Sequence, residues 1–328
     1  MARGMCVALG LVALLAGGWG FTQRLQVKAL SEKHQVLVDQ LQSENEKLQA
    51  AFAENRRLTM AQAGAQTELE DAQTRIRDLQ VDVEKAAAFG RSLNLVKIPA
   101  GVFVMGSPSS EVGRNADEVQ HRVRISRDFF LGKYEVTQRQ WELVMGTNPS
   151  RFNGGDRPVE LVSSDDAMAF CRNLNEKTVG SRPSGYVFCL PTEAQWEYAC
   201  RADTRSALNS GKALTTKDVG CPNLDALAWY GGNSGGETHA VGLKPPNQAG
   251  LYDMHGNVWE WCSDWYGAYP SGSVTDPRGA DAGRYRVFRG GSWRNYARHC
   301  RAALRPWYTP GIRYNLGFRL CLSPGRER

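Results

Sequence analysis

The segment GLYDMHGNVWEWCSDWY, from Gly250 to Tyr266, constrains the fold of this chain more than any other stretch. Carboxylates, a Gly-Asn pair and three tryptophans within one short segment suit a rigid, ligand-holding turn rather than a simple core strand. Two carboxylates and the intervening backbone carbonyls could converge on a hard cation such as calcium, which takes oxygen ligands. The residues that would hold it are Asp253, Gly256, Val258 and Glu260. The alternative is that Asp253 caps a turn, Gly256-Asn257 supplies left-handed backbone and the tryptophans are core.

The N-terminal end of the chain has the layout of a targeting segment. Residues 5–21 form an uncharged, largely apolar run, which Arg3 precedes and Arg24 and Lys28 follow. This layout is typical of a secretory signal or of an uncleaved signal anchor. Because no A-x-A cleavage site is evident, we favour an anchor over residues 1–24, with a cleaved signal as the alternative. We therefore expect a membrane-anchored protein that faces the periplasm or the extracellular space.

Residues 25–89 are predicted to form a coiled-coil stalk. An uninterrupted heptad frame runs from residue 27 to residue 86, with alternating spacings of three and four between its two series. Polar residues interrupt the hydrophobic seam at His34, Glu44, Asn55 and Gln62. A buried Asn at such a position favours a fixed register and a dimer. We expect a homo-oligomer; the alternative is a single exposed helix that stays monomeric.

The basic charge is concentrated near the C-terminal end of the chain. Nine arginines, and no lysine or acid, occur from Arg284 to Arg319. Such a cluster could bind an anionic ligand. Arginines interleaved with apolar residues are equally typical of partly buried ion pairs. Nucleic-acid binding is not expected, because an exported domain rarely meets nucleic acid and the sequence contains no evident recognition helix.

Residues 90–328 are predicted to form one α+β domain. Capping boxes indicate helix starts at Thr137–Gln140 and Thr192–Gln195, with a weaker one at Ser163–Asp166. Apolar residues at i, i+3, i+4 and i+7 predict one buried helical face over residues 165–177. Short β-like runs occupy residues 101–107, 121–126, 284–290 and 316–322. Frequent glycine and proline between residues 211 and 283 predict long irregular loops.

Six motifs occur in an order that strongly resembles the sulfatase-modifying-factor family, which includes the formylglycine-generating enzymes. They are IPAGVFVMGS (98–107), GKYEVTQRQW (132–141), LPTEAQWEYACRA (190–202), GLYDMHGNVWEWCSDWY (250–266), FRGGSW (288–293) and LGFRL (316–320). The resemblance implies a compact variant of the C-type-lectin fold with little regular secondary structure. It also implies structural calcium at positions that match Asp253, Gly256, Val258 and Glu260, the glycine and the valine contributing backbone oxygen.

This sequence departs from the family where the oxidase chemistry resides. Formylglycine-generating enzymes use copper held by two cysteine thiolates, because a linear two-sulfur site stabilises soft Cu(I). In the family this pair lies between the GGS and GFR motifs, and here that interval contains only Cys300. No catalytic residue is therefore assigned, and copper is not expected. The five histidines form no helical His-x-x-x-His group, so the iron-dependent branch of the superfamily gains no support.

Eight cysteines in an exported chain are expected to be largely oxidised. Family members carry two structural disulfides. By resemblance, one of these would join Cys200 to Cys300 and the other Cys171 to Cys321. The pairing of the three remaining cysteines of the domain stays open: Cys189, Cys221 and Cys262.

The stretch from Trp293 to Asn315 has the mixture of aromatic and hydrogen-bonding side chains that binding surfaces contain. The candidate ligand-binding residues are Trp293, Asn295, Tyr296, His299, Arg301, Trp307, Tyr308 and Tyr314. The region also resembles the variable tail of lectin-fold proteins that retroelements diversify. The alternative is an ordinary family tail that lines the ancestral peptide cleft.

These observations together predict a domain that recognises a peptide, protein or glycan ligand and carries structural calcium. The rival prediction is an oxidoreductase or protein-maturation enzyme of the same family with an altered active site. The identity of the ligand does not follow from the sequence.

Overall fold

The computed structural model of the protein describes residues 33–44, 46–47, 72–77, 93–178 and 182–325. The chain divides into two compact units. The first contains Met1–Ser92 and Thr178–Pro183, and the second contains Leu93–Lys177 and Ser184–Arg328.

The described residues of the first unit below residue 93 are helical. In the stretch 33–44, the half-buried positions are His34, Leu37, Val38, Leu41 and Glu44, and all but Val38 belong to the two series of the heptad frame. The predicted anchor, residues 1–24, and most of the predicted stalk lie outside the described residues. Within the described part of the chain, no helix is both long and apolar enough to cross a membrane.

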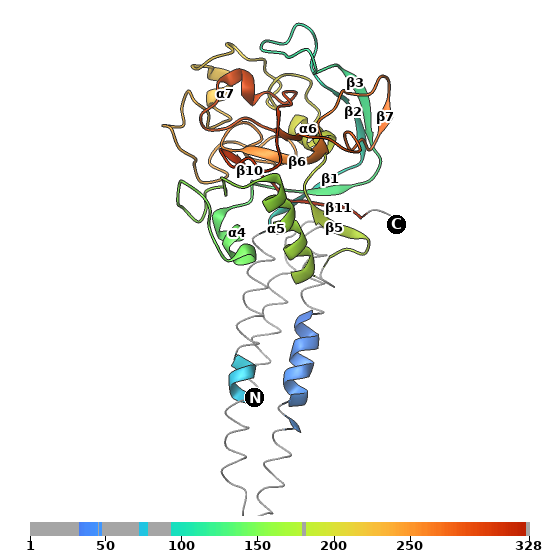
Figure 1. Ribbon diagram of the computed structural model, residues 1–328, viewed down its shortest axis with the longest axis vertical. Coiled ribbons are helices and arrows are strands. Elements are labelled where there is room, and N and C mark those ends of the chain that lie inside the picture. Colours follow the sequence, from blue (N-terminus) through green and yellow to red (C-terminus); the bar gives the residue numbers. More distant parts are fainter. Residues whose placement is uncertain (1–32, 45, 48–71, 78–92, 179–181, 326–328) are drawn as a thin grey trace, which may run out of the picture. The chain divides into compact units, whose positions relative to one another are not determined.

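Three small sheets organise the second unit (Figure 1). The first sheet has the order β1-β4-β11-β5 and is antiparallel throughout. Its strands are β1 (Leu95–Ile98), β4 (Phe129–Gly132), β11 (Cys321–Pro324) and β5 (Tyr186–Cys189). In this sheet Leu131 pairs with Val96 on one side and with Cys321 on the other, so β4 joins the first and last strands of the unit.

The second sheet contains the second half of the segment from Gly250 to Tyr266. Its order is β10-β6-β8-β9, and only the β10–β6 pair is parallel. The strands are β10 (Leu316–Gly317), β6 (Trp259–Trp265), β8 (Arg286–Arg289) and β9 (Trp307–Tyr308). The third sheet, β2-β3-β7, comprises β2 (Gly101–Met105), β3 (His121–Ile125) and β7 (Val274–Thr275).

Three of the helices begin where the sequence predicts. Both oxygen acceptors of each capping box are in place at Thr137–Gln140 and Thr192–Gln195. Ser163 and Asp166 exchange the corresponding bonds, with the Ser163 Oγ accepting from the Asp166 N–H at 3.1 Å. These caps begin α4 (Gln138–Met145), α6 (Glu193–Arg201) and α5 (Ser164–Lys177). The short α7 (Pro222–Asp225) and a 3-10 turn (Ala297–Cys300) complete the helices of this unit's described residues.

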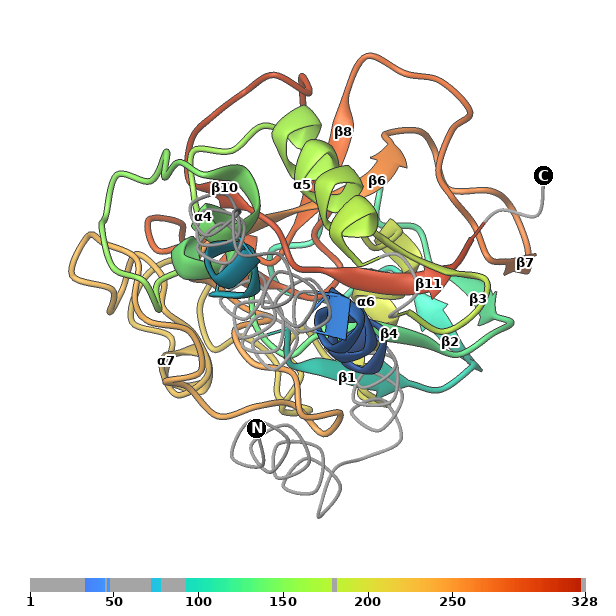
Figure 2. The same cartoon turned by 90° about the horizontal axis from the view of Figure 1, so that it is seen from below.

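The predicted apolar face of residues 165–177 is buried, which confirms that prediction. Phe170 stacks on Trp141 with ring centroids 5.6 Å apart, and Phe318 packs edge-on against both rings. Helix α5 also packs on β5, and it lies beside β11 when the molecule is viewed from below (Figure 2). One core cluster contains Trp196, Met105 and Leu131 with their neighbours between the sheets and α6, and a second contains Leu208, Leu224, Tyr230 and Cys300.

Two β-like stretches differ from the prediction. The run 316–322 is split into β10 and β11, because Arg319 turns into the core and the chain passes from one sheet to another. The segment 259–265, expected as part of a rigid turn, is the central strand β6, with most of its residues buried. A strand covered on both faces lacks the polar–apolar alternation by which a strand is recognised in sequence.

Candidate functional site

The turn that precedes β6 has the backbone geometry that the sequence predicts. Asp253, Gly256 and Asn257 all have positive φ, at 55°, 83° and 54°. Gly256 is required there, because a Cβ atom would lie 2.2 Å from the Trp229 carbonyl oxygen. The Asn257 N–H donates to that same oxygen at 2.7 Å, and Gly256 N–H donates to Gly290 at 2.8 Å. The turn is therefore fixed to two other loops by its backbone.

Three buried carboxylates converge beneath this turn. Asp253 is 2% exposed; its Oδ2 accepts from the Gly242 N–H at 2.7 Å, while its Oδ1 has no partner among the described residues. Glu135 is 1% exposed and accepts from Asn257 Nδ2 at 2.7 Å and from Val258 N–H at 3.0 Å. Burial raises the pKa of Asp253 to about 6. Burial and the charges of Asp253 and Glu260 raise the pKa of Glu135.

Glu260 is the third carboxylate, and an arginine compensates it. Arg319 donates to both Glu260 oxygens at 2.6 Å, and Trp196 Nε1 donates to one of them at 2.6 Å. All three side chains are fully buried. Because each carboxylate oxygen has two lone pairs, the Oε1 that accepts only from Arg319 can still bind a ligand.

Among the described residues, no group of three or more His, Cys, Asp or Glu side chains is arranged to hold a metal ion, so the calcium expected from the sequence stays a prediction. Arg319 compensates the charge of Glu260, and the raised pKa values of Asp253 and Glu135 favour their neutral forms. The unpartnered atom of the three carboxylates is Asp253 Oδ1, to which a calcium ion would give a partner. The residues expected from the sequence to hold it are Asp253, Glu260 and the backbone at Gly256 and Val258, and Glu135 contacts the same turn through Asn257 and Val258. Sequence reasoning missed Glu135, although it is a lone acid in GKYEVTQ just before a helix cap.

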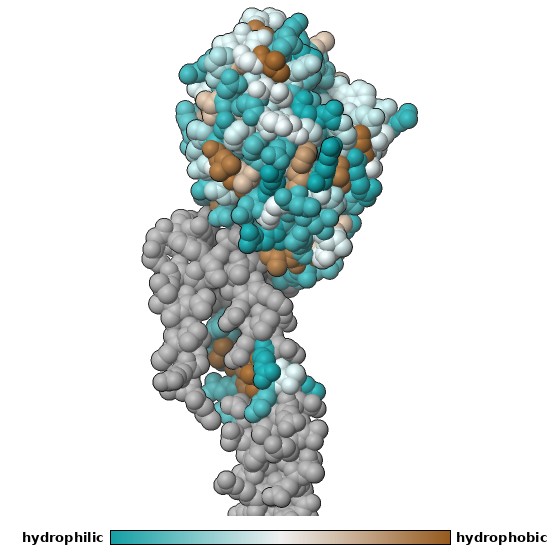
Figure 3. Space-filling view, turned by 90° about the vertical axis from the view of Figure 1, so that its left-hand side faces the viewer, coloured by the Kyte–Doolittle hydropathy of each residue, from teal (hydrophilic) through white to brown (hydrophobic). Residues whose placement is uncertain are grey.

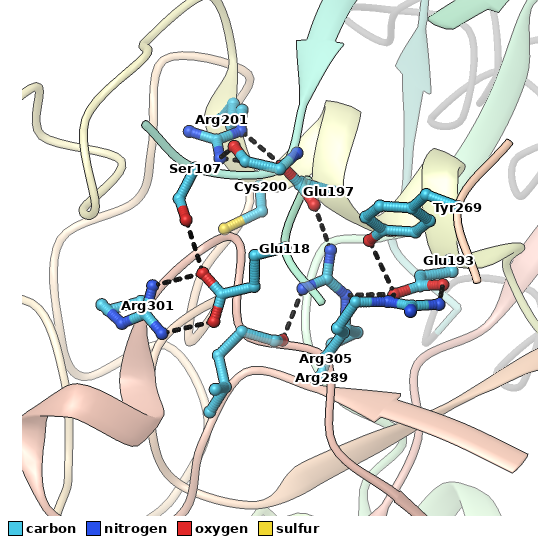
Figure 4. A network of polar contacts seen from close by, with 12 residues as sticks. Ser107, Glu118, Glu193, Glu197, Cys200, Arg201, Tyr269, Arg289, Arg301 and Arg305 are labelled. Carbon is cyan, nitrogen blue, oxygen red and sulfur yellow. Dashed lines mark hydrogen bonds and ion pairs between the residues drawn. The ribbon is translucent and has the colours of Figure 1, made fainter. Parts of the chain in front are cut away.

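Four of the nine arginines of the cluster form buried ion pairs, and Figure 4 shows three of them, Arg289, Arg301 and Arg305. Arg305 binds Glu193 with two hydrogen bonds, at 2.8 and 2.9 Å, and Arg289 pairs with Glu197. Burial would raise the pKa of Glu193, but Arg305 and Arg289 hold it below its ordinary value. Of the two interpretations open for this cluster, the buried ion pairs are thus correct for these arginines and for Arg319.

Arg301 is a correction to the predicted ligand-binding residues. Its side chain is fully buried and donates to both oxygens of Glu118, at 2.6 and 2.7 Å, and to Glu111 at 2.7 Å (Figure 4). A guanidinium whose donors are satisfied inside the domain cannot contact a ligand on its surface. The sequence pattern gave no sign of this, because the paired acids lie more than 180 residues earlier.

The cysteines also differ from the prediction. All seven described cysteines are free thiols, so neither Cys171–Cys321 nor Cys200–Cys300 is a disulfide in this structure. His255 lies between the second pair: its Nε2 is 4.0 Å from Cys200 Sγ, and its Nδ1 is 2.6 Å from the Cys300 carbonyl oxygen. Cys321 is the register partner of Cys189 across β11 and β5, rather than of Cys171.

Cys300 is an enclosed thiol. It is 0% exposed, and a methyl group on Gly291 of the GGS motif would lie 2.4 Å from its sulfur. Burial raises the pKa of Cys300 to about 12. The thiol therefore stays protonated at neutral pH, whereas the thiolate is the form that attacks or binds a metal.

The backbone of residues 292–300 is held in place while several of its side chains face outward. Trp293 N–H donates to Asn257, the Trp293 carbonyl accepts from Ser234 Oγ, and the Asn295 carbonyl accepts from Gly231 N–H. Trp293, Asn295 and His299 are half-buried, and Tyr296 is 46% exposed. Trp307, Tyr308 and Tyr314 are 40%, 50% and 48% exposed. On the face of this unit that Figure 3 shows, hydrophobic residues form small separate patches among hydrophilic ones.

Comparisons with known proteins identify relatives over most of the second unit. The profile of the sulfatase-modifying factor enzyme 1-like domain matches residues 80–324. The formylglycine-generating enzyme of Mus musculus is 30% identical over 291 residues, which cover 69% of this chain and 74% of that protein. The chaperone protein LppX of Paenibacillus barcinonensis is 34% identical over 212 residues, 51% of this chain and 69% of that one.

Solved structures of related proteins share the fold. Treponema denticola variable protein 1 superposes with a TM-score of 0.61 at 35% identity, covering 69% of this chain and 94% of that one. PvdO from Pseudomonas aeruginosa superposes with a TM-score of 0.58 at 28% identity, covering 70% of this chain and 93% of that one.

Proposed function

This chain belongs to the sulfatase-modifying factor enzyme 1-like family, and from that membership we propose that its domain is a recognition module rather than a formylglycine-generating oxidase. The observation that carries the proposal is Cys300. It is the single thiol between the GGS and GFR motifs, and it is fully buried with a raised pKa. A two-thiolate copper site needs a second sulfur and an ionised first one.

The same stretch supports binding in place of oxidation. Its backbone is anchored by hydrogen bonds to residues 231, 234 and 257, so exposed side chains can contact a ligand without a cost for ordering the loop. Four of the residues predicted to bind ligand lie on this stretch, Trp293, Asn295, Tyr296 and the half-buried His299, while Trp307, Tyr308 and Tyr314 are exposed outside it. The ligand class proposed from the sequence is a peptide, a protein or a glycan.

The remaining parts of the proposal concern placement and cofactor. We place the domain on the exported side of a membrane, anchored through residues 1–24 and self-associated through the stalk of residues 25–89. The buried carboxylates around Asp253 would hold structural calcium. Their role would be to fix the turn that anchors residues 292–300, since Asn257 contacts both Glu135 and Trp293.

A second candidate function is a binder that retroelements diversify in its tail. The similarity to Treponema denticola variable protein 1 over 94% of that chain favours it. Sequencing the neighbouring DNA tests it: a near-copy of the 3′ end of this gene beside a reverse transcriptase gene should be present. If neither the near-copy nor the reverse transcriptase gene is present, the domain is the ordinary recognition module of the first proposal.

The full-length protein in detergent tests the main proposal directly. Loaded with Cu(I) and given a Cys-x-Pro-x-Arg peptide, it should form no formylglycine by mass spectrometry, while the mouse enzyme under the same conditions does. Ligands captured from peptide and glycan arrays should bind the Cys300→Ser variant as they bind the wild type. They should bind a Tyr296→Ala variant poorly, whereas Leu243→Ala, at a 62% exposed site, serves as the matched control. Peptide turnover would refute the proposal.

A further inference from the structure

We propose that an arginine–aromatic patch on the domain, made of Arg151, Phe152, Trp293, Arg294 and Tyr314, binds the carboxylate side chains of an acidic peptide segment. This inference rests on the proposed recognition function and gives it a ligand chemistry. Of these residues, only Trp293 and Tyr314 stand out in the sequence as candidates for ligand binding.

Ring contacts make the patch continuous, although its residues come from three distant segments. The Phe152 and Trp293 rings meet edge-on with centroids 5.2 Å apart. The Arg294 guanidinium lies 5.7 Å from the Trp293 ring centre and 4.7 Å from that of Tyr314. The Arg151 guanidinium lies 5.2 Å from the Phe152 ring centre. Both arginines and Tyr314 are exposed.

The two arginines of the patch are unlike those of the core. Arg301, Arg305 and Arg319 each bind a buried glutamate. Neither Arg151 nor Arg294 forms an ion pair with any carboxylate among the described residues. The acid nearest to Arg151 in this segment, Glu160, is 2% exposed and accepts the backbone N–H groups of residues 151 and 152, at 2.5 and 3.0 Å. Glu160 anchors the loop through these two bonds, and it interacts electrostatically with Arg151 without forming an ion pair at contact distance.

The polar groups beside the rings add hydrogen-bond donors. Asn295 Oδ1 accepts from Ser292 Oγ at 2.5 Å and from Asn315 Nδ2 at 3.3 Å, so the half-buried Asn295 presents its amide NH₂ as the remaining group. Trp293 Nε1 is buried and has no acceptor among the described residues. The guanidinium and amide groups donate, and the complementary ligand is rich in acceptors and negatively charged.

The positions of the guanidiniums favour carboxylates over a sugar. One face of Phe152 and one of Tyr314 are covered by an arginine, so these faces are not free to stack on a sugar ring. A planar guanidinium held on an aromatic face keeps its outer N–H groups for two parallel bonds to a carboxylate. The aspartate and glutamate side chains of an acidic peptide supply such groups, one for each arginine of the patch.

Fluorescence anisotropy with a labelled hexaglutamate peptide and the full-length protein tests the inference. Hexaglutamate should bind, hexaglutamine should not, and affinity should fall as the salt concentration rises, because the contacts are exposed. Arg294→Gln and Arg151→Gln should each weaken binding about tenfold, the effect of losing one charge-assisted hydrogen-bonded pair. The matched control is Arg284→Gln: Arg284 is also exposed, lies 5.4 Å over Tyr285 and forms no ion pair with a described residue, so its loss should change affinity less than twofold.

Three results would overturn the inference. The first is equal binding of hexaglutamate and hexaglutamine. The second is that Arg284→Gln weakens binding as much as the patch variants do, which would show that affinity depends on net charge alone. The third is tighter binding of a heparin hexasaccharide that the patch variants weaken, which would assign the patch to a sulfated glycan. Each of these leaves the recognition proposal intact, because that proposal fails on peptide turnover and not on ligand charge.

Discussion

At the scale of single residues, burial raises the pKa of an acid unless a charged partner compensates it. Asp264 on β6 is 2% exposed and lies beside Glu193, whose backbone N–H donates to it at 2.9 Å. Burial and the Glu193 charge raise the pKa of Asp264 from 3.8 to about 7. Between these two values the folded state keeps a proton that the unfolded chain has lost. The contribution of Asp264 to the free energy of unfolding therefore falls as the pH rises from 4 to 7.

We expect Asp264→Asn to remove this pH dependence. The amide oxygen can still accept from Glu193 and Ser263, but it carries no charge to desolvate. The variant should exceed the wild type in unfolding free energy at pH 8, by on the order of 3 kcal/mol, and should match it at pH 4. Urea unfolding at both pH values measures the difference. If the variant and the wild type differed equally in unfolding free energy at pH 4 and pH 8, the raised pKa of Asp264 would be contradicted.

The proposed calcium site gives a second prediction at this scale. Calcium should raise the Tm of the wild type, because an ion that binds only the folded state stabilises it. Asp253→Asn and Glu135→Gln should abolish that rise and should lower the Tm little in chelator. Glu260 is unsuitable for this test, since its removal would leave Arg319 buried and unpaired. Asp264→Asn is the control that keeps the response; a calcium-induced rise that survives in Asp253→Asn would exclude the site.

At the scale of elements, local signals predicted helices better than strands. Helices α4, α5 and α6 begin at the predicted caps, because a cap depends on residues three positions apart. Strands β2, β3 and β8 were also predicted from their local composition. In contrast, β7 and β9 have two residues each and β6 is buried on both faces, so their pairing depends on distant partners.

The same distinction applies to the site. The turn geometry at Gly256 and Asn257 follows from local sequence, and the structure confirms it. Glu135, which contacts this turn, lies 122 residues before Asn257. Glu118, which pairs with Arg301, lies 183 residues before it. Only the folded chain brings such residues together.

A substitution at a helix cap tests whether the local capping signal stabilises its helix. Thr192→Ala removes the side-chain acceptor of the Gln195 N–H, which lies 3.1 Å away, and should lower the unfolding free energy by about 1 kcal/mol. Urea denaturation measures the change, and Ser210→Ala at an exposed position should have no effect. If Thr192→Ala left the unfolding free energy unchanged, tertiary packing alone would stabilise α6.

At the scale of the whole molecule, the heptad frame predicts self-association. Leu37 and Leu41 are half-buried on the predicted seam, whereas Gln42 is exposed beside it. In light scattering of the full-length protein in detergent, we expect Leu37→Asp or Leu41→Asp to reduce the mass from an oligomer to a monomer. Gln42→Asp should leave the mass unchanged. A wild type that is already monomeric would favour the single exposed helix.

The pairing of β4 with both β1 and β11 has a consequence for how the domain is made. Leu131 has Val96 on one side and Cys321 on the other, so this sheet cannot close until the last strand has been synthesised. Sheets that depend on such distant contacts form slowly. A chain that enters an export channel with its N-terminal end first would therefore pass through before this sheet is complete, in the unfolded state that translocation through a narrow channel requires.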